Sequence, residues 1–198
     1  MKKIEIALAA AFALCFLGAL AQASFSARCA RVRDDTLRLH IVANSDSGED
    51  QRVKLLVRDA LLGQVAALTD GCADKAAAVG AADRACASLA ATAQAVLRAN
   101  GLGYGASAKI TEMYFDERVY GDVTLPAGVY TALRVELGEA KGHNWWCVLY
   151  PAVCFAASSE RQLAGYDGAE IDLVTGGQRY ALRFKVEAWL RQREAEGR

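Results

Sequence analysis

The first 23 residues form an apolar segment whose pattern differs from that of the remaining chain. Lys2 and Lys3 precede an unbroken run of 15 apolar residues, 6–20, and Ala21-Gln22-Ala23 follows it with small residues at both ends. This order is typical of a secretory signal peptide, and the run is short for a spanning helix, which needs roughly 20 apolar residues. We therefore expect residues 1–23 to be a signal peptide cleaved after Ala23. The alternative is an uncleaved anchor, which would be the chain's only contact with a membrane.

A polar stem and a strand are expected next. Residues 24–35 carry several arginines and aspartates, and we expect them only to space the domain from the membrane or from the cleavage site. Residues 36–43 then alternate between two sets of side chains: Leu37, Leu39 and Ile41 against Arg38, His40 and Val42. A period of two predicts a strand with one buried face.

Two helices are predicted after this strand. The polar segment 44–48 favours a turn, and Ser47 followed by Asp50 resembles a capping box at the start of a helix over about 49–68. Thr69 or Asp70 is expected to cap a second, alanine-rich helix over about 73–99. Asn100-Gly101 ends that helix, with glycine suited to a left-handed cap.

The second half of the chain changes to strand-like sequence and ends in a helix. Partial alternation of β-branched and aromatic residues predicts strands over 107–115 and 130–137. A third strand over 145–150 has few charges, so we expect it to be central, with a loop at 120–126 and a turn at 138–144. The last helix is predicted over about 181–194 and has two sides: Leu182, Val186, Trp189 and Leu190 on one, and Arg183, Lys185, Glu187 and Arg191 on the other.

This order of elements predicts an α+β fold. Strand, two helices, three strands and a helix suggest a small mixed or mostly antiparallel sheet with helices packed on one face. Length favours a single α+β domain over residues 36–198. The chain has 23 basic and 23 acidic side chains and no basic run, so nucleic acid is not expected as a partner.

Five of the six cysteines lie outside the signal segment. An odd number in an exported chain implies an unpaired thiol. Cys72 and Cys86 lie on one predicted helix roughly 21 Å apart, whereas a disulfide needs Cα atoms within about 7 Å, so they do not pair with each other. Cys147 and Cys154 are close enough in sequence to bridge across a turn, and we predict that disulfide; buried thiols are the alternative.

Two polar segments, 44–47 and 138–147, follow predicted strands and are the places where a functional site is expected. Both segments could face each other at one edge of the sheet. Simpler roles are also open: a helix cap and turn for the first segment, and core packing for Trp145 and Trp146. Adjacent strand residues point to opposite faces, so one of the tryptophans could be an exposed anchor for a protein partner.

Catalytic interpretations of these segments are weak. Cys147 with His143 and either Asn144 or Asp46 has the residue types of a nucleophile, a base and an orienting group. Positions 143 and 147 are roughly 13 Å apart in an extended strand, however, so only a bend would join them. Asp46 and Glu139 could be the carboxylate pair of a sugar hydrolase. With two histidines and no CxxC or HExxH motif, the spacing of metal ligands is absent, and we expect no metal or cofactor.

Two stretches are distinctive in combination. One runs from Leu37 to Asp59 and contains Ala43-Asn-Ser-Asp-Ser47; the other runs from Tyr120 to Phe155 and contains Asn144-Trp-Trp-Cys147. Over about residues 36–155 the chain resembles the stage II sporulation protein R family of endospore-forming bacteria. It departs from the family pattern at Pro151-Ala152, where two prolines are common, and the tail after residue 155 matches no pattern.

The resemblance implies a function that spacing cannot supply. Members are exported from the forespore into the space between two membranes, where they trigger a membrane-embedded aspartic protease that cleaves the pro-form of sigma-E. The resemblance carries over no catalytic residues and no small-molecule substrate. The residues that match the family motif are Asn44, Asp46, Asp50, Asn144, Trp145, Trp146, Cys147 and Cys154.

The leading hypothesis is therefore an exported signalling protein that binds the extracytoplasmic side of such a protease and is not itself an enzyme. The candidate partner-binding residues are Asn44, Asp46, Asp50, Glu139, His143, Asn144, Trp145 and Trp146. The alternatives are an envelope hydrolase or peptidoglycan-binding domain, using Asp46 and Glu139, and a membrane-tethered structural protein.

Overall fold

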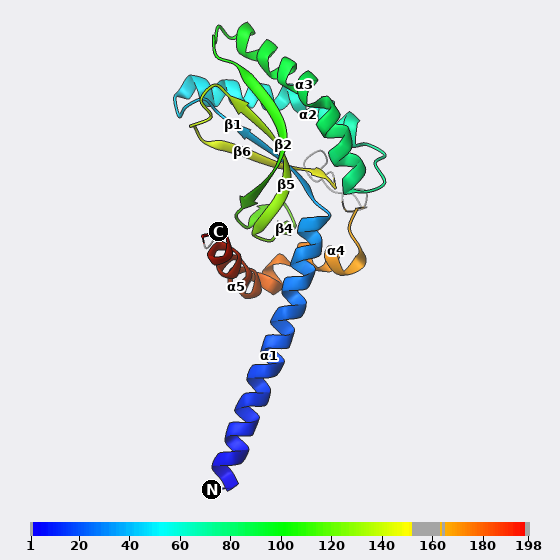
Figure 1. Ribbon diagram of the computed structural model, residues 1–198, viewed down its shortest axis with the longest axis vertical. Helices are drawn as coiled ribbons and strands as arrows, with labels where there is room; N and C mark the ends of the chain where they lie inside the picture. The colour runs from blue at the N-terminus through cyan, green and yellow to red at the C-terminus, as the bar shows by residue number, and fades with distance from the viewer. Residues whose placement is uncertain (1, 152–162, 164, 197–198) are drawn as a thin grey trace. The chain divides into compact units, whose positions relative to one another are not determined.

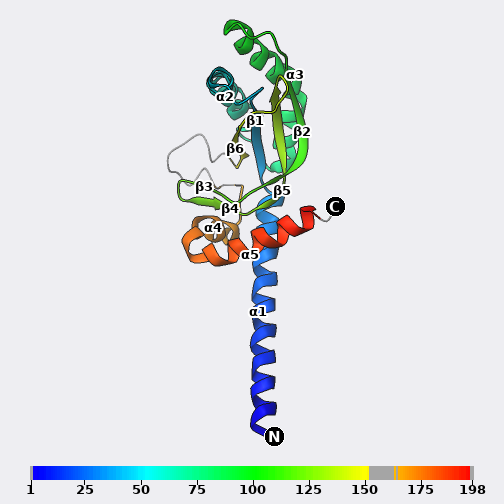
Figure 2. The same cartoon turned by 90° about the vertical axis from the view of Figure 1, so that its left-hand side faces the viewer.

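The computed structural model describes residues 2–151, 163 and 165–196, and its chain divides into two compact units (Figures 1 and 2). Unit 1 gathers Met1–Val32, Asp116–Gly128 and Gly168–Arg198, and unit 2 gathers Arg33–Phe115 and Val129–Asp167. The single domain expected over residues 36–198 stays a prediction, although two of its segments group with the N-terminal helix.

Unit 2 is built on a four-stranded mixed sheet. Its strands are β1 (Leu37–Val42), β2 (Ala106–Phe115), β5 (Gly128–Leu137) and β6 (Asn144–Tyr150), in the order β2-β5-β1-β6. Strand β1 pairs in parallel with β5 and antiparallel with β6, which confirms the mixed sheet. The expected central position of the last strand was wrong, because β6 lies at one end of the described order and β1 lies inside it.

Two helices cover one face of this sheet and confirm the α+β class (Figure 1). Helix α2 (Gly48–Thr69) places a buried residue every four positions along one side, and helix α3 (Lys75–Ala99) buries mainly alanine and leucine. A spacing of four residues keeps side chains on one helix face, and alanine allows close approach. The core that forms includes the predicted apolar side of β1: Leu37, Leu39 and Ile41.

The second face of β1 is also buried, so the expectation of one buried face was wrong. Arg38 is fully buried, with its guanidinium 4.1 Å from the ring centre of Phe115 and 5.0 Å from that of Tyr130. His40 is 2% exposed, and burial lowers its pKa from 6.5 to about 4. This interior strand accepts these polar side chains because aromatic rings lie beside them.

Unit 1 contains one long helix and a set of short elements. Helix α1 (Lys2–Asp34) is joined in this unit by the hairpin of β3 (Arg118–Tyr120) and β4 (Val123–Leu125), and by α4 (Gly168–Thr175) and α5 (Gly177–Glu196). The loop expected at 120–126 is thus a hairpin, turning at Gly121 with φ of +58°. Sequence patterning also missed α4.

Helix α1 has two parts with different surroundings. It contains an apolar window that is long and apolar enough to cross a membrane, and that window is not buried. Beyond it, the residues expected as a polar stem continue the helix, and Phe25, Cys29 and Val32 are fully buried. They are spaced three and four residues apart and so form one apolar stripe, which packs in unit 1 instead of serving only as a spacer.

Candidate functional site

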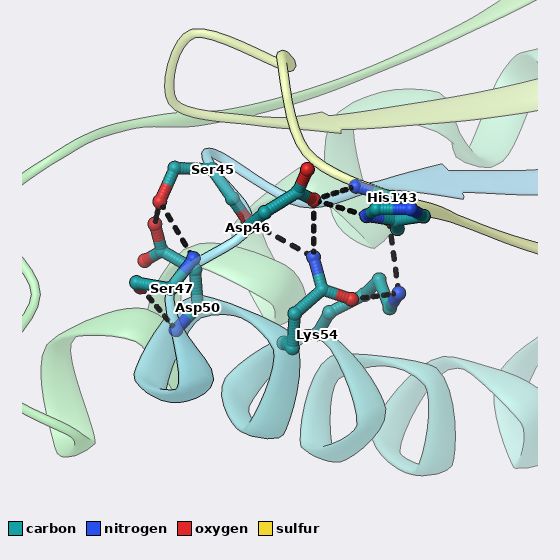
Figure 3. Close-up of polar contacts among 7 residues, drawn as sticks. Ser45, Asp46, Ser47, Asp50, Lys54 and His143 are labelled. Carbon is teal, nitrogen blue, oxygen red and sulfur yellow. Dashed lines mark hydrogen bonds and ion pairs between the residues drawn. The ribbon is translucent and has the colours of Figure 1, made fainter.

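The two polar segments singled out in the sequence lie against each other in unit 2. The backbone N–H of Gly142 donates to the carbonyl of Ala43 at 3.0 Å, and that of Lys141 donates to the carbonyl of Asn44 at 3.1 Å. The first segment leaves β1 and the second precedes β6, which is its neighbour in the sheet. The predicted juxtaposition at one sheet edge is confirmed, and Figure 3 shows the polar contacts that accompany it.

The carboxylate of Asp50 fixes the first polar segment by accepting hydrogen bonds from its side chains. Its Oδ2 accepts hydrogen bonds from Asn44 Nδ2 at 2.9 Å and Ser45 Oγ at 2.5 Å, and its Oδ1 accepts from the Tyr104 hydroxyl at 2.5 Å. Burial alone would raise the pKa of Asp50, but these donors hold it below its ordinary value. Burial and the Asp50 carboxylate both raise the pKa of Tyr104, so the hydroxyl stays protonated and donates.

The predicted cap at the start of α2 is confirmed. Ser47 is the N-cap residue, with φ of −61° and ψ of 146°, and its hydroxyl accepts from the backbone N–H of Asp50 at 3.1 Å. Because Asp50 is only 6% exposed, it shapes the turn and offers little surface to a partner. Its place among the partner-binding candidates stays a prediction, as does that of Asn44.

Asp46 and His143 join the two segments at the surface. Asp46 Oδ1 accepts from the backbone N–H of His143 at 2.5 Å and lies 2.5 Å from its Nδ1. The hydrogen bond with the imidazole, followed by the one with the backbone, lowers the pKa of the Asp46 carboxyl. The side chains remain 55% and 80% exposed, so both are open to solvent and to a partner while their backbones are fixed.

Lys54 supports this pair and was missed in the sequence. The residue is 4% exposed, and its Nζ donates to the carbonyl of His143 at 2.9 Å and to Gln51 Oε1 at 2.6 Å (Figure 3). Burial lowers its pKa. A lysine in the second turn of a helix gives no signal of this role, because its acceptor is 89 residues away in the chain.

Two glycines allow the close approach of the segments. A Cβ atom on Gly142 would lie 2.2 Å from the carbonyl oxygen of Ser45, and one on Gly138 would lie 2.1 Å from Asn44 Oδ1. Gly138 also has φ of +57°, in the left-handed region that favours glycine. The glycine-bearing turn is therefore a packing requirement of this site.

Glu139 lies on the same surface. Its carboxylate is 2.7 Å from Lys141 Nζ, which lowers its pKa, and its backbone N–H donates to Asn44 Oδ1 at 2.9 Å. Asp46 and Glu139, weighed above as a hydrolase pair, are thus each engaged by a separate neighbour. No group of three or more potential metal ligands occurs among the described residues.

The two tryptophans point to opposite faces of β6, as predicted. Trp145 packs with the core under α2 and α3 and carries the Arg58 guanidinium 5.3 Å from its ring centre. Trp146 lies 6.1 Å from both Phe115 and His40 on the other face. Both are half-buried, and Asn144 beside them is exposed.

Cys147 is fully buried and disulfide-bonded, which removes it as a nucleophile. Cys154 lies outside the described residues, and the Cys147–Cys154 pairing stays a prediction. Cys15, Cys72 and Cys86 are free thiols.

Comparisons with known proteins agree on one family. The model of the family described as stage II sporulation protein R matches residues 33–160. A relative named "Stage II sporulation protein R", from Bacillus subtilis (strain 168), is 32% identical over 124 residues, which is 63% of this chain and 55% of the relative. The match therefore spans about half the length of that relative. No solved structure matches the chain. The site described above lies inside the matched region, whereas α1 up to Val32, α4 and α5 lie outside it.

Proposed function

Because this chain belongs to the stage II sporulation protein R family, we propose that it is an exported signal of sporulation that activates a membrane-embedded aspartic protease, which then cleaves the pro-form of sigma-E. In this proposal the chain is made in the forespore and acts in the space between the two membranes around it. Family membership makes it a sporulation protein; the protease, the sigma factor and the compartment are parts of the proposal.

One structural feature supports a particular surface as the binding site for the protease. Two segments nearly 100 residues apart are fixed by backbone hydrogen bonds while their charged tips remain in solvent. We name this the turn–loop surface and define it by its exposed residues: Asp46, Glu139, Lys141, His143 and Asn144. Binding a rigid surface loses little conformational freedom, which favours recognition by a protein partner.

The chemistry of this surface supports binding over catalysis. Asp46 is held by hydrogen bonds with His143 and Glu139 by an ion pair with Lys141, so each carboxylate is already engaged. Cys147, the nucleophile considered above, is disulfide-bonded. Helix α1 supports export, because it is apolar and long enough to enter a membrane.

The test uses a sporulating host that lacks its own family protein. We expect the full chain to restore cleavage of the sigma-E pro-form, followed by immunoblot, and a chain without residues 1–23 to fail. If the full chain is exported but no cleavage follows, the proposed function is wrong.

A matched pair of variants then tests the surface. Asp46→Ala combined with His143→Ala is expected to abolish cleavage while the protein stays folded, because both side chains are exposed and the backbone hydrogen bonds of Gly142 and Lys141 to the first segment remain. Asp59→Ala is the control: its side chain is 57% exposed, against 55% for Asp46, and it pairs with the neighbouring Arg58. Normal cleavage with the double variant would show that the signal is carried by another surface.

A further inference from the structure

The outer face of α5 is apolar at its centre and faces solvent. Leu182 is 77% exposed, Trp189 is 54% exposed and Val186 is 39% exposed. At 100° per residue these three side chains fall within about 60° of each other on the helix. Phe184 and Glu187, on the opposite side, are the ones that are buried. The apolar side predicted from sequence is therefore largely the side that does not pack in unit 1.

Basic side chains border this apolar centre. Arg183 and Arg193 are exposed around it, and the Arg193 guanidinium lies 4.6 Å from the Trp189 ring centre. Arg179 is exposed too, and it pairs with Asp172 at 3.1 Å. Two acidic residues of the helix are bound by Arg191. Glu187 is fully buried and binds Arg191 at 2.9 Å, and Glu194 binds Arg191 at 2.6 Å. We call the set Arg179, Leu182, Arg183, Val186, Trp189 and Arg193 the α5 outer face. A helix with an apolar stripe flanked by arginines suits the interface of an anionic bilayer.

Helix α5 is fixed to α1 next to the segment that is apolar enough to cross a membrane. The ring of Phe25 lies 5.2 Å from Phe184 and 5.6 Å from Tyr180, and Ser26 Oγ donates to Glu187 Oε2 at 2.5 Å. In Figures 1 and 2, α5 lies beside α1. It is nearer than the β3–β4 hairpin to the N-terminal end of α1.

The depth of this attachment matches the bilayer interface. The apolar run ends at Leu20, five residues before Phe25, which is about 7.5 Å along a helix. Each interfacial layer of a bilayer is roughly 5–8 Å thick, from the difference between the total and hydrocarbon thicknesses. If residues 6–20 occupy the hydrocarbon, Phe25 and the helix that packs on it lie at the headgroups.

We propose that the α5 outer face binds the anionic surface of the bilayer that α1 enters, with Trp189 and Leu182 inserted at the headgroup level and the arginines on acidic lipids. This binding orients unit 1 on the membrane. It rests on unit 1 alone and requires that residues 1–23 are retained as an uncleaved anchor, the alternative to cleavage given above. It is independent of the proposed signalling function.

The experiment uses the full chain reconstituted in vesicles of phosphatidylcholine with phosphatidylglycerol at 7:3, some of the lipid being brominated on its acyl chains. Bromine quenches only tryptophans that enter the bilayer. We expect quenching in the wild type, loss of the quenched component in Trp189→Phe, and a marked reduction in Leu182→Glu. Leu56→Glu is the matched control, since Leu56 is a partly exposed leucine on α2. Vesicles of phosphatidylcholine alone are expected to give much weaker quenching.

Four results would overturn the inference. They are absence of quenching in the wild type, equal quenching in Trp189→Phe, equal effects of Leu182→Glu and Leu56→Glu, and equal quenching in neutral vesicles. If Trp189 instead becomes shielded from acrylamide as the protein concentration rises, without quenching by bromine, a second copy covers the face and the lipid is the wrong occupant. Trp189→Phe preserves an aromatic ring, so loss of folding does not explain a loss of signal.

Discussion

Replacing Asp50 by alanine is expected to destabilise unit 2 strongly. The change removes the acceptor of three side-chain donors: Asn44, Ser45 and Tyr104. A hydrogen bond to a charged group contributes about 1.5–3 kcal/mol net, and a buried donor left without an acceptor costs about as much. Three such bonds set an upper limit of roughly 9 kcal/mol, but water will reach a site so near the surface. We expect a loss of about 3–5 kcal/mol in the free energy of unfolding.

The conservative variant separates charge from shape. Asp50→Asn keeps one acceptor oxygen but places an amide N–H₂ where a second donor arrives, so a smaller loss of about 1–3 kcal/mol is expected. It also alters the pH dependence. The folded-state pKa of Asp50 lies below its ordinary value of 3.8, so the stability it supplies is present above that pKa and is lost as the pH falls through the lowered one. Asp50→Asn should therefore weaken the acid sensitivity of folding.

The assay is equilibrium urea unfolding of the full chain in a mild nonionic detergent, followed by circular dichroism. Asp59→Ala on the same helix serves as the control, because its carboxylate is exposed and contributes at most about 1 kcal/mol. If Asp50→Ala were no more destabilising than Asp59→Ala, the carboxylate would not organise the turn, and the explanation of the site geometry given above would fail.

Two further predictions concern the turn and the sheet. Gly142→Ala is expected to lower the free energy of unfolding by about 1–3 kcal/mol in the same urea assay, because the added Cβ meets the Ser45 carbonyl. Gly63→Ala is the control: this position on α2 has open space, so the variant should raise the free energy of unfolding by about 0.5–1 kcal/mol. The His40 imidazole is expected to titrate near pH 4 by NMR. Because its pKa falls from 6.5 on folding, the unfolded chain takes up a proton first as the pH falls. The free energy of unfolding is therefore highest above pH 6.5 and falls by about 3 kcal/mol toward pH 4. A His40→Gln variant with the same loss between these pH values, or an imidazole that titrates near 6.5, would contradict this.

The sequence by itself determined the features that depend on neighbouring residues. Apolar period and composition located the apolar segment that begins α1, the helices α2 and α3 and most of the strands, and Ser47 with Asp50 marked the start of α2. The alternation along β6 predicted that its two tryptophans lie on opposite faces of the sheet, and the structure confirms this. These features follow from backbone geometry and from hydrogen bonds within a few residues, so a local pattern is sufficient to predict them. The juxtaposition of the two polar segments also followed, because both flank strands of one sheet.

Only the tertiary structure decided which partners meet across the chain. Tyr104 reaches Asp50 from 54 residues away, and Lys54 reaches the carbonyl of His143 from 89. The same holds for burial: Phe25, in the segment expected as a polar stem, is fully buried, while Leu182 and Trp189 on the amphipathic helix α5 stay in solvent. An apolar side chain is buried only where another element covers it, and local periodicity carries no information about which elements pack together. That choice depends on the summed contacts of the whole fold.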